Sequence, residues 1–202
     1  MLAILVVIAV AAGVWALAAI VRNGFSARTP PTAFETAVAK QVWQWSVPSR
    51  AREQANPVPR DAAAIEDGLQ HFADHCAICH GNDGSGDTEI GRHLYPRPPD
   101  LRLPATQART DGELFYIIEE GIRFTGMPAF ATGTREGADS SWRLVHFIRH
   151  LPSLSPDALE RMRALNPKSA DEWRQEEAER QFLEGTDDKS PAGHAPAPGH
   201  RH

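Results

Sequence analysis

Residues 76–80 form the motif Cys76-Ala77-Ile78-Cys79-His80, which contains the only two cysteines of the 202-residue chain. A C-x-x-C-H sequence is typical of covalent attachment of a c-type haem. Two thiols three residues apart on one turn can add to the two vinyl groups of a haem, and the adjacent histidine is then held against the iron. The motif therefore predicts one covalent haem, with Cys76 and Cys79 as its attachment points and His80 as the proximal iron ligand.

Three other interpretations of the cysteine pair compete with haem attachment. A zinc site needs about four ligands, usually with a second pair of cysteines, and the chain has no second pair. A thioredoxin-like redox pair is expected near a βαβ pattern, which the sequence does not contain. A disulfide between Cys76 and Cys79 would close a very short loop and would constrain little of the unfolded chain. Haem attachment is the interpretation that we favour.

Residues 1–21 are almost entirely apolar, and no charged residue occurs between Leu2 and Val21. Twenty such residues in a helix rise about 30 Å, which matches the hydrocarbon core of a bilayer. The alternative is a cleaved secretory signal, with Ala16-Leu17-Ala18 as a small-residue cleavage pattern. The apolar run is longer than the core of a signal peptide, and no basic region precedes it. We therefore predict an uncleaved transmembrane anchor.

Residues 22–60 contain five prolines and carry six basic and two acidic groups. This composition predicts a tether with a short helix around Thr32–Trp45, and its basic character could hold it near anionic headgroups. Trp43 and Trp45 either anchor at the membrane interface or pack on the folded domain. The sequence does not separate these two alternatives.

Apolar residues at helical spacing predict an all-α domain over residues 61–153. Asp61 can cap a helix whose apolar stripe ends at the haem motif. The following loop, residues 81–91, is rich in Gly, Asp and Asn. It lacks the spacing of a calcium-binding EF-hand, so turn residues are the better interpretation. A second helix is predicted to open at Asp111, and a third to begin near Asp139–Ser141.

The C-terminal part is predicted to be a helical extension over residues 154–185 and a disordered tail over residues 186–202. Ser155-Pro156 opens a short helix, and the capping-box pattern from Ser169 to Glu172 opens another. The tail is rich in Pro and His, a composition typical of disorder. Its histidines could bind Cu or Ni ions, although their irregular spacing favours a solvated tail; they are His194, His200 and His202.

Met127 is the best candidate for a second axial ligand of the iron. It lies in Thr125-Gly126-Met127-Pro128, a loop between two predicted helices, 47 residues after His80. Proline and glycine restrict this backbone and allow it to approach a ring. The alternative is an ordinary core methionine that fills a gap. A Met/His pair raises the potential of a haem iron, as in cytochromes c.

With these residues, the chain resembles the class I cytochromes c in their single-haem, membrane-anchored bacterial form. The resemblance covers about residues 61–152, including the Pro-rich segment Tyr95–Leu101 and the helix Trp142–Leu151. It implies an all-α domain wrapped on one haem, with His80 and Met127 as the axial ligands. It also implies that the first and last helices cross where Gly68 meets an aromatic residue, Trp142 or Phe147, and that a proline carbonyl orients the histidine.

Two arguments about membrane orientation disagree. Arg22 and Arg28 follow the span, which by the positive-inside rule would place the rest of the chain in the cytoplasm. The resemblance implies covalent haem attachment on the periplasmic side in bacteria. Because the charge bias is weak, we predict a single-pass protein of the inner membrane with its haem domain in the periplasm.

The function predicted from the sequence is one-electron transfer between redox proteins, without an enzymatic activity or a small-molecule substrate. The acidic balance of residues 61–153 argues against nucleic acid as a partner and favours transient docking on a basic patch of a redox protein. A haem enzyme or gas-binding protein with an open sixth position is an alternative, and His93 is its only candidate acid or base. A permanent electron-transfer subunit of a larger oxidoreductase is another.

Overall fold

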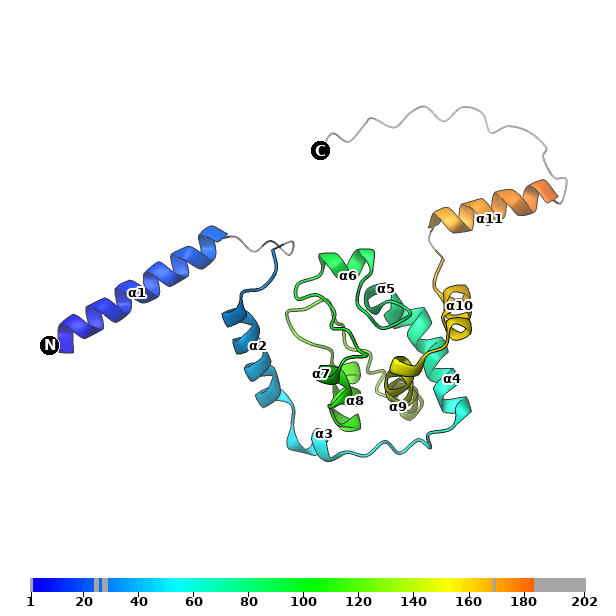
Figure 1. The fold of residues 1–202 in the computed structure, drawn as a ribbon, viewed down its shortest axis with the longest axis horizontal. Helices are drawn as coiled ribbons and strands as arrows, with labels where there is room; N and C mark the ends of the chain where they lie inside the picture. The colour runs from blue at the N-terminus through cyan, green and yellow to red at the C-terminus, as the bar shows by residue number, and fades with distance from the viewer. Residues whose placement is uncertain (1, 24–25, 27–28, 169, 184–202) are drawn as a thin grey trace, which may run out of the picture. The chain divides into compact units, whose positions relative to one another are not determined.

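The computed structural model describes residues 2–23, 26, 29–168 and 170–183, and within these ranges the regular structure is helical, without strands (Figure 1). The chain divides into two compact units, Met1–Asn166 and Pro167–His202. The helices of the first unit are α1 (Leu2–Asn23), α2 (Ala33–Ser46), α3 (Ser49–Glu53), α4 (Ala62–His71), η1 (Phe72–Cys76), α5 (Ala77–His80), α6 (Glu89–His93), α7 (Pro104–Gln107), α8 (Asp111–Glu120), α9 (Arg135–His150), η2 (Leu151–Ser153) and α10 (Pro156–Leu165). The second unit contains α11 (Ala170–Leu183). The all-α prediction is confirmed.

Helix α1 is long and apolar enough to cross a bilayer, and among the described residues no other helix meets this test. The apolar window Leu2–Ala19 is not buried against any other part of the protein. A helix of this kind fits the predicted anchor in length and composition.

The haem motif lies at the end of α4 and its continuation. The Asp61 carboxylate accepts a hydrogen bond of 2.8 Å from the Ala64 N–H, so Asp61 caps α4 as predicted. The helix then widens into the π-helical turn η1 and continues as α5, which ends at His80. Gly81 follows with φ +75°, a left-handed conformation that suits glycine and stops the helix. Single π-turns inside helices are frequent at functional sites.

Helices α4 and α9 cross at Gly68, in close contact (Figure 1). A Cβ atom at Gly68 would overlap the Arg143 carbonyl oxygen and lie 2.9 Å from the Phe147 Cβ. Only a glycine allows the two backbones to approach this closely. The crossing implied by the family resemblance is therefore confirmed, with Phe147 rather than Trp142 as the aromatic partner.

Helix α9 begins earlier than predicted. It starts at Arg135, and the Thr134 hydroxyl caps it by accepting a hydrogen bond of 3.1 Å from the Gly137 N–H. The predicted start near Asp139–Ser141 was wrong because it followed the apolar stripe, whereas the first turn of α9 is polar and only later turns face the core.

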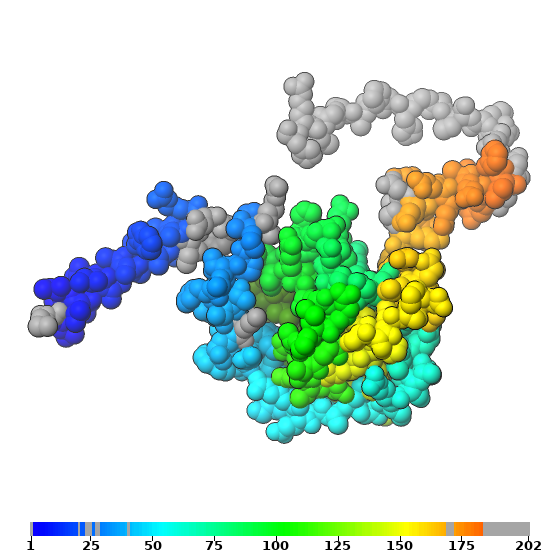
Figure 2. Space-filling model, viewed as in Figure 1, coloured from blue at the N-terminus to red at the C-terminus, as the bar shows by residue number. Residues whose placement is uncertain are grey.

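Helix α10 is part of the packed first unit. Met162 is fully buried, and the yellow segment that contains α10 lies against the cyan segment that contains α4 (Figure 2). The Asn166 side-chain amide donates a 2.9 Å hydrogen bond to the Ala73 carbonyl. Residues 156–166 thus belong to the haem-domain core, although the sequence placed them in an extension outside it.

Much of the predicted tether also packs on the domain. Thr32 and Glu35 form a capping box at the start of α2, which confirms the predicted short helix. Further along, Val47 and Ala51 are buried. The Asn56 side-chain amide donates a 2.9 Å hydrogen bond to the Trp142 carbonyl, which places residue 56 against α9. The second half of residues 22–60 therefore packs on the domain and is not the free tether that the sequence predicted.

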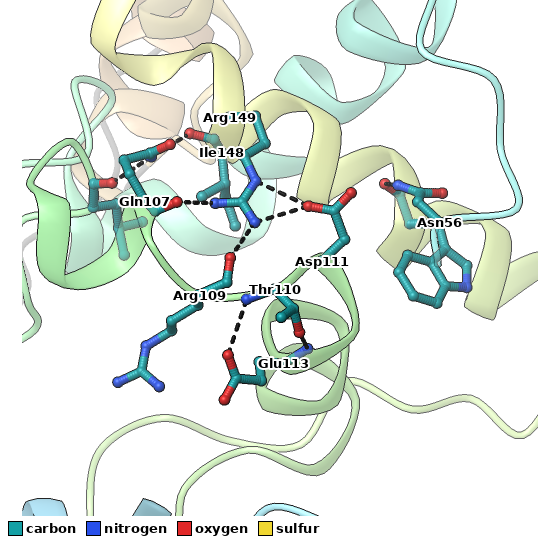
Figure 3. A network of polar contacts seen from close by, with 10 residues as sticks. Asn56, Gln107, Arg109, Thr110, Asp111, Glu113, Ile148 and Arg149 are labelled. Carbon is teal, nitrogen blue, oxygen red and sulfur yellow. Dashed lines mark hydrogen bonds and ion pairs between the residues drawn. The ribbon is translucent and has the colours of Figure 1, made fainter. Parts of the chain in front are cut away.

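A polar network joins the α7–α8 segment to α9 (Figure 3). The Arg149 guanidinium donates two hydrogen bonds of 2.9 and 2.8 Å to the Asp111 carboxylate. It also donates to the carbonyl oxygens of Gln107 and Arg109. One guanidinium therefore holds the start of α8 and the loop before it against the last turns of α9.

Candidate haem site

The three residues of the haem motif lie together on one helical turn. Cys76 ends η1, and Cys79 and His80 lie on the following α5. The His80 ring lies 6.4 Å, centroid to centroid, from the Phe72 ring, and Phe72 lies 5.1 Å from Phe147 of α9. Phe72 and Phe147 are both buried. The α4–α9 crossing therefore supports the histidine from behind.

His80 has the properties of a metal ligand. Burial lowers the pKa of its imidazole to about 4, so the ring is neutral at physiological pH. Its Nδ1 atom is buried and has no hydrogen-bond partner among the described residues. A neutral imidazole coordinates metal through one nitrogen, and its orientation is set by a bond at the other. An unpaired buried nitrogen on a C-x-x-C-H turn fits a haem iron.

The two cysteines are partly exposed free thiols. Burial, with a smaller effect from Cys79, raises the pKa of Cys76 to about 12, and burial also raises the pKa of Cys79. Reactive cysteine pairs of oxidoreductases have lowered pKa values that produce a thiolate at neutral pH. The shift here has the opposite direction, which does not favour a redox-active dithiol.

Helix α6 clamps the haem motif from one side. The Thr88 hydroxyl donates to the carbonyl oxygens of Ile78 and Cys79, at 2.9 and 3.2 Å, and accepts a bond of 2.8 Å from the Gly91 N–H. A Cβ at Gly91 would lie 2.6 Å from the Cys79 carbonyl oxygen, so this approach requires glycine. These contacts were not predicted from sequence, where their only signal is a threonine three residues before a glycine.

The loop between α5 and α6 joins the end of the haem motif to the Pro-rich segment. The Gly86 N–H donates a 2.7 Å hydrogen bond to the His80 carbonyl. A Cβ at Gly86 would lie 2.5 Å from the Pro98 carbonyl oxygen, so Gly86 lies directly between the two segments. The Asp83 carboxylate accepts a bond from the Ser85 N–H and pairs with Arg102, as turn residues do. The turn interpretation is confirmed for residues 81–88, whereas residues 89–91 form the start of α6.

Met127 lies half-buried in the turn between α8 and α9. Its carbonyl accepts a 3.1 Å hydrogen bond from the Ile122 N–H, and its own N–H donates a 3.1 Å bond to the Thr125 hydroxyl. A Cβ at Gly126 would lie 2.7 Å from the Leu94 side chain. Leu94 directly follows α6, the helix that clamps Cys79. The Met127 turn and the haem motif are thus linked through α6 and Leu94, the residue that follows it.

The remaining candidate residues give no second site. His93 is exposed, and its Nδ1 lies 2.7 Å from the Glu89 carbonyl oxygen of its own helix. The described part of the chain holds no group of three or more His, Cys, Asp or Glu side chains placed to bind a metal ion. The tail histidines lie outside the described residues, as does Ser169 of the predicted capping box; the histidines are His194, His200 and His202.

Comparisons with known proteins agree with the motif. Residues 63–148 match the family model described as cytochrome c oxidase, cbb3-type, subunit III. Over 50 residues the chain is 38% identical to thiosulfate dehydrogenase of Stutzerimonas stutzeri (strain A1501); this match covers 25% of the chain and 16% of that relative. A chain of the Kuenenia stuttgartiensis reducing HAO-like protein complex is 22% identical, with a TM-score of 0.41 over 47% of this chain and 46% of its own.

The protein carries a c-type cytochrome domain over residues 63–148. Such a domain binds a haem covalently and transfers electrons through its iron. The family match, the all-α fold and the C-x-x-C-H turn agree on this class. The chain spans about one sixth of the length of the curated relative.

Proposed function

We propose that this protein is a membrane-anchored, one-electron carrier with a single haem on Cys76 and Cys79. In this proposal His80 and Met127 hold the iron from its two sides, and the acidic domain docks transiently on redox partners in the periplasm. A single haem follows from the single C-x-x-C-H motif and the absence of other cysteines in the sequence. The observation that carries the proposal is the buried, unpaired Nδ1 of His80 on that motif.

The structure supports distinct roles for the residues around the iron. The core behind His80 supports its ring through Phe72, which packs on Phe147. The Met127 turn, held by bonds to Ile122 and Thr125, would supply the thioether ligand in this proposal. A haem with a His/Met ligand pair supplies a closed, high-potential redox centre. Two protein ligands leave no position for a substrate, which favours a carrier over an enzyme.

The second candidate is a permanent electron-transfer subunit of a larger oxidoreductase. The similarity to a segment of thiosulfate dehydrogenase favours it, because that relative is an enzyme several times longer than the matched segment. The two candidates differ in whether the protein stays bound to its redox partner or docks on it only transiently. Gentle detergent extraction from the native membrane followed by size-exclusion chromatography separates the two: a carrier elutes as the free chain, and a subunit co-elutes with its enzyme.

The first test is an absorption spectrum of the dithionite-reduced full chain, produced with covalent haem, before and after addition of carbon monoxide. A closed His80/Met127 iron gives a low-spin spectrum that carbon monoxide does not change. Prompt binding of the gas would contradict the proposed ligand pair and favour a haem enzyme or gas-binding protein.

The second test replaces the ligand. Met127→Ala is expected to keep the covalent haem, lower the reduction potential and allow carbon monoxide to bind. Met162→Leu is the matched control, since it removes the other buried methionine with little change in volume. A Met127→Ala protein with the spectrum and potential of the wild type would show that Met127 is not the ligand.

A further inference from the structure

Helix α2 carries an exposed apolar stripe. The exposed fractions of its large apolar residues are 77% for Phe34, 44% for Val38, 56% for Val42 and 76% for Trp45. At about 100° per residue, these four positions fall within about 80° of one another around the helix. They therefore form one continuous strip, which we call the α2 stripe.

The opposite side of α2 packs on the haem domain. Trp43 is nine residues after Phe34 and so lies on the other side of the helix, about 180° away. The Arg109 guanidinium carbon lies 4.1 Å from the centroid of the Trp43 ring, in a cation–π contact. Arg109 also accepts the Arg149 bond through its carbonyl, while its side chain points away from Arg149 (Figure 3). Trp43 thus joins α2 to the network that holds α9.

Further contacts at the two ends of α2 fix its rotation. At the end of the helix Val47 is buried, and α3, which begins two residues later, packs on α8, where Gly112 contacts the Ala51 carbonyl. At the start, the Glu35 carboxylate completes the capping box with Thr32 and interacts with the Tyr95 hydroxyl. With both ends and the middle engaged, the α2 stripe points away from the domain. The two tryptophans therefore have separate roles that the sequence alone did not distinguish.

We propose that the α2 stripe is immersed in the membrane interface, with lipid as its partner, and that it holds the haem domain in one orientation against the bilayer. Helix α2 is the first element after the α1 span, with ten peptide steps from Asn23 to Ala33, at most about 35 Å of extended chain. Tryptophan and phenylalanine on one face of a short helix suit the headgroup boundary.

The charge of the neighbouring chain favours the same partner. Residues 22–60 carry six basic and two acidic groups, whereas residues 61–153 are acidic. Anionic headgroups attract basic segments close to the surface. The basic region is therefore the part of the molecule that a bilayer attracts, and the acidic haem domain is the part that remains available to a basic redox partner.

This inference goes beyond electron transfer and does not rest on the iron ligands. A flexible tether of 39 residues would have an r.m.s. span of about 35 Å and would let the haem face any direction. A docked α2 would instead restrict the domain to a narrow range of heights and orientations. Partner encounter would then be a search across the membrane plane.

The test measures the depth of nitroxide labels by electron paramagnetic resonance. The haem-loaded full chain is reconstituted in vesicles of phosphatidylethanolamine and phosphatidylglycerol, with a new cysteine labelled at position 38 (Val38→Cys) or, as the aqueous control, at position 53 in α3 (Glu53→Cys). Immersion predicts that the label at 38 collides with oxygen and loses collisions with a water-soluble nickel complex, while the label at 53 keeps them.

A second pair of variants tests the aromatic residues. With the label at position 38, the double change Phe34→Ser and Trp45→Ser is expected to restore collisions with the nickel complex. The matched control, Trp173→Ser with Phe182→Ser, removes two equally exposed aromatic residues of α11 and should leave the label immersed. The reduced haem spectrum verifies that each variant is folded.

Two results would overturn the proposal. One is full access of the nickel complex to position 38 in the otherwise unchanged chain. The other is dipolar broadening between labels that disappears on dilution with unlabelled protein, because it would show that a second copy of the chain covers the stripe. Either result would contradict the membrane position of α2 without changing the outcome of the carbon monoxide test of the iron ligands.

Discussion

The two sides of the proposed haem site differ in how the fold holds them. On the histidine side, His80 lies against Phe72, and the α4–α9 crossing lies behind it with almost no exposed surface. On the methionine side, the turn from Ile122 to Met127 is held by a few local hydrogen bonds, and Phe124 within it is 93% exposed.

Because of this difference, substitutions on the two sides should change different properties of the protein. Substitutions behind His80 should act mainly on the free energy of unfolding, because they remove buried contacts. Substitutions in the Met127 turn should act mainly on the haem spectrum and potential, because little of the core depends on that turn.

Gly68→Val is expected to cause the greatest loss of stability. Its Cβ would overlap the Arg143 carbonyl oxygen, a backbone atom that cannot move unless α9 shifts. We expect a loss of about 3 kcal/mol or more in the free energy of unfolding, at the upper end of overpacking effects. Urea unfolding followed by circular dichroism measures it. Ala63→Val, at an exposed position of the same helix, is the control and should cost less than about 1 kcal/mol. Equal effects of the two would mean that the crossing is not close-packed.

Met162→Ala tests whether α10 belongs to the histidine side. The Met162 side chain is fully buried, and truncation of such a residue typically costs about 2–5 kcal/mol. Leu165→Ala, on the same helix with 41% of its surface exposed, should cost about 1 kcal/mol or less. The haem spectrum should be unchanged in both proteins. A negligible cost for Met162→Ala would place α10 outside the core.

Met162 also illustrates a contact that the sequence could not predict. The helix at Ser155–Pro156 was predicted correctly, because capping and proline signals are local. The burial of its single methionine in the core was not predicted, because four of the ten residues of α10 are charged and long-range packing decides which residues of such a helix are buried. For the same reason Arg149, a charged residue at the end of α9, gave no sign that it would hold the α7–α8 segment.

The haem motif itself was predictable because its chemistry requires residues adjacent in sequence. Cys76, Cys79 and His80 share one turn whatever surrounds them. The ligand from the other side depends on tertiary structure, so Met127 rests on its loop context and on the link through Leu94 and Gly126. Thr88, whose hydroxyl joins the motif to α6, could not be found from sequence, since it looks like any helix cap.

A fall in pH should lower the free energy of unfolding through a residue on the histidine side of the site. His71 lies half-buried on α4, and burial, together with the neighbouring His75, lowers its pKa. Because the pKa of His71 is lower in the folded chain, the unfolded chain binds this proton at a higher pH. The contribution of His71 to the free energy of unfolding is therefore complete above a pH of about 6.5 and is lost as the pH falls toward the folded-state pKa.

Urea unfolding of the haem protein between pH 7.5 and 5.5 measures this loss. His71→Gln should flatten the dependence over that range, by less than the cost of Met162→Ala, because a partly exposed ring is screened by water. The reduced spectrum should stay constant, since the Met127 turn is not involved. An unchanged pH dependence in the variant would assign the titration to another group.

The smallest expected effect is in the methionine turn itself. Phe124 has φ +62°, a left-handed conformation that costs a residue with a Cβ about 1–2 kcal/mol. Glycine adopts this conformation freely but loses about 0.5–1 kcal/mol more in backbone entropy on folding. Because the phenyl ring is almost fully exposed, Phe124→Gly should stabilise the protein by about 0.5 kcal/mol, whereas Phe124→Ala keeps the Cβ and should give no gain. Chemical unfolding of both variants, with carbon monoxide binding as a second readout, checks the prediction. If Phe124→Gly loses stability or opens the iron to the gas, the exposed ring supports the ligand turn, and the two sides of the site are less different than their burial indicates.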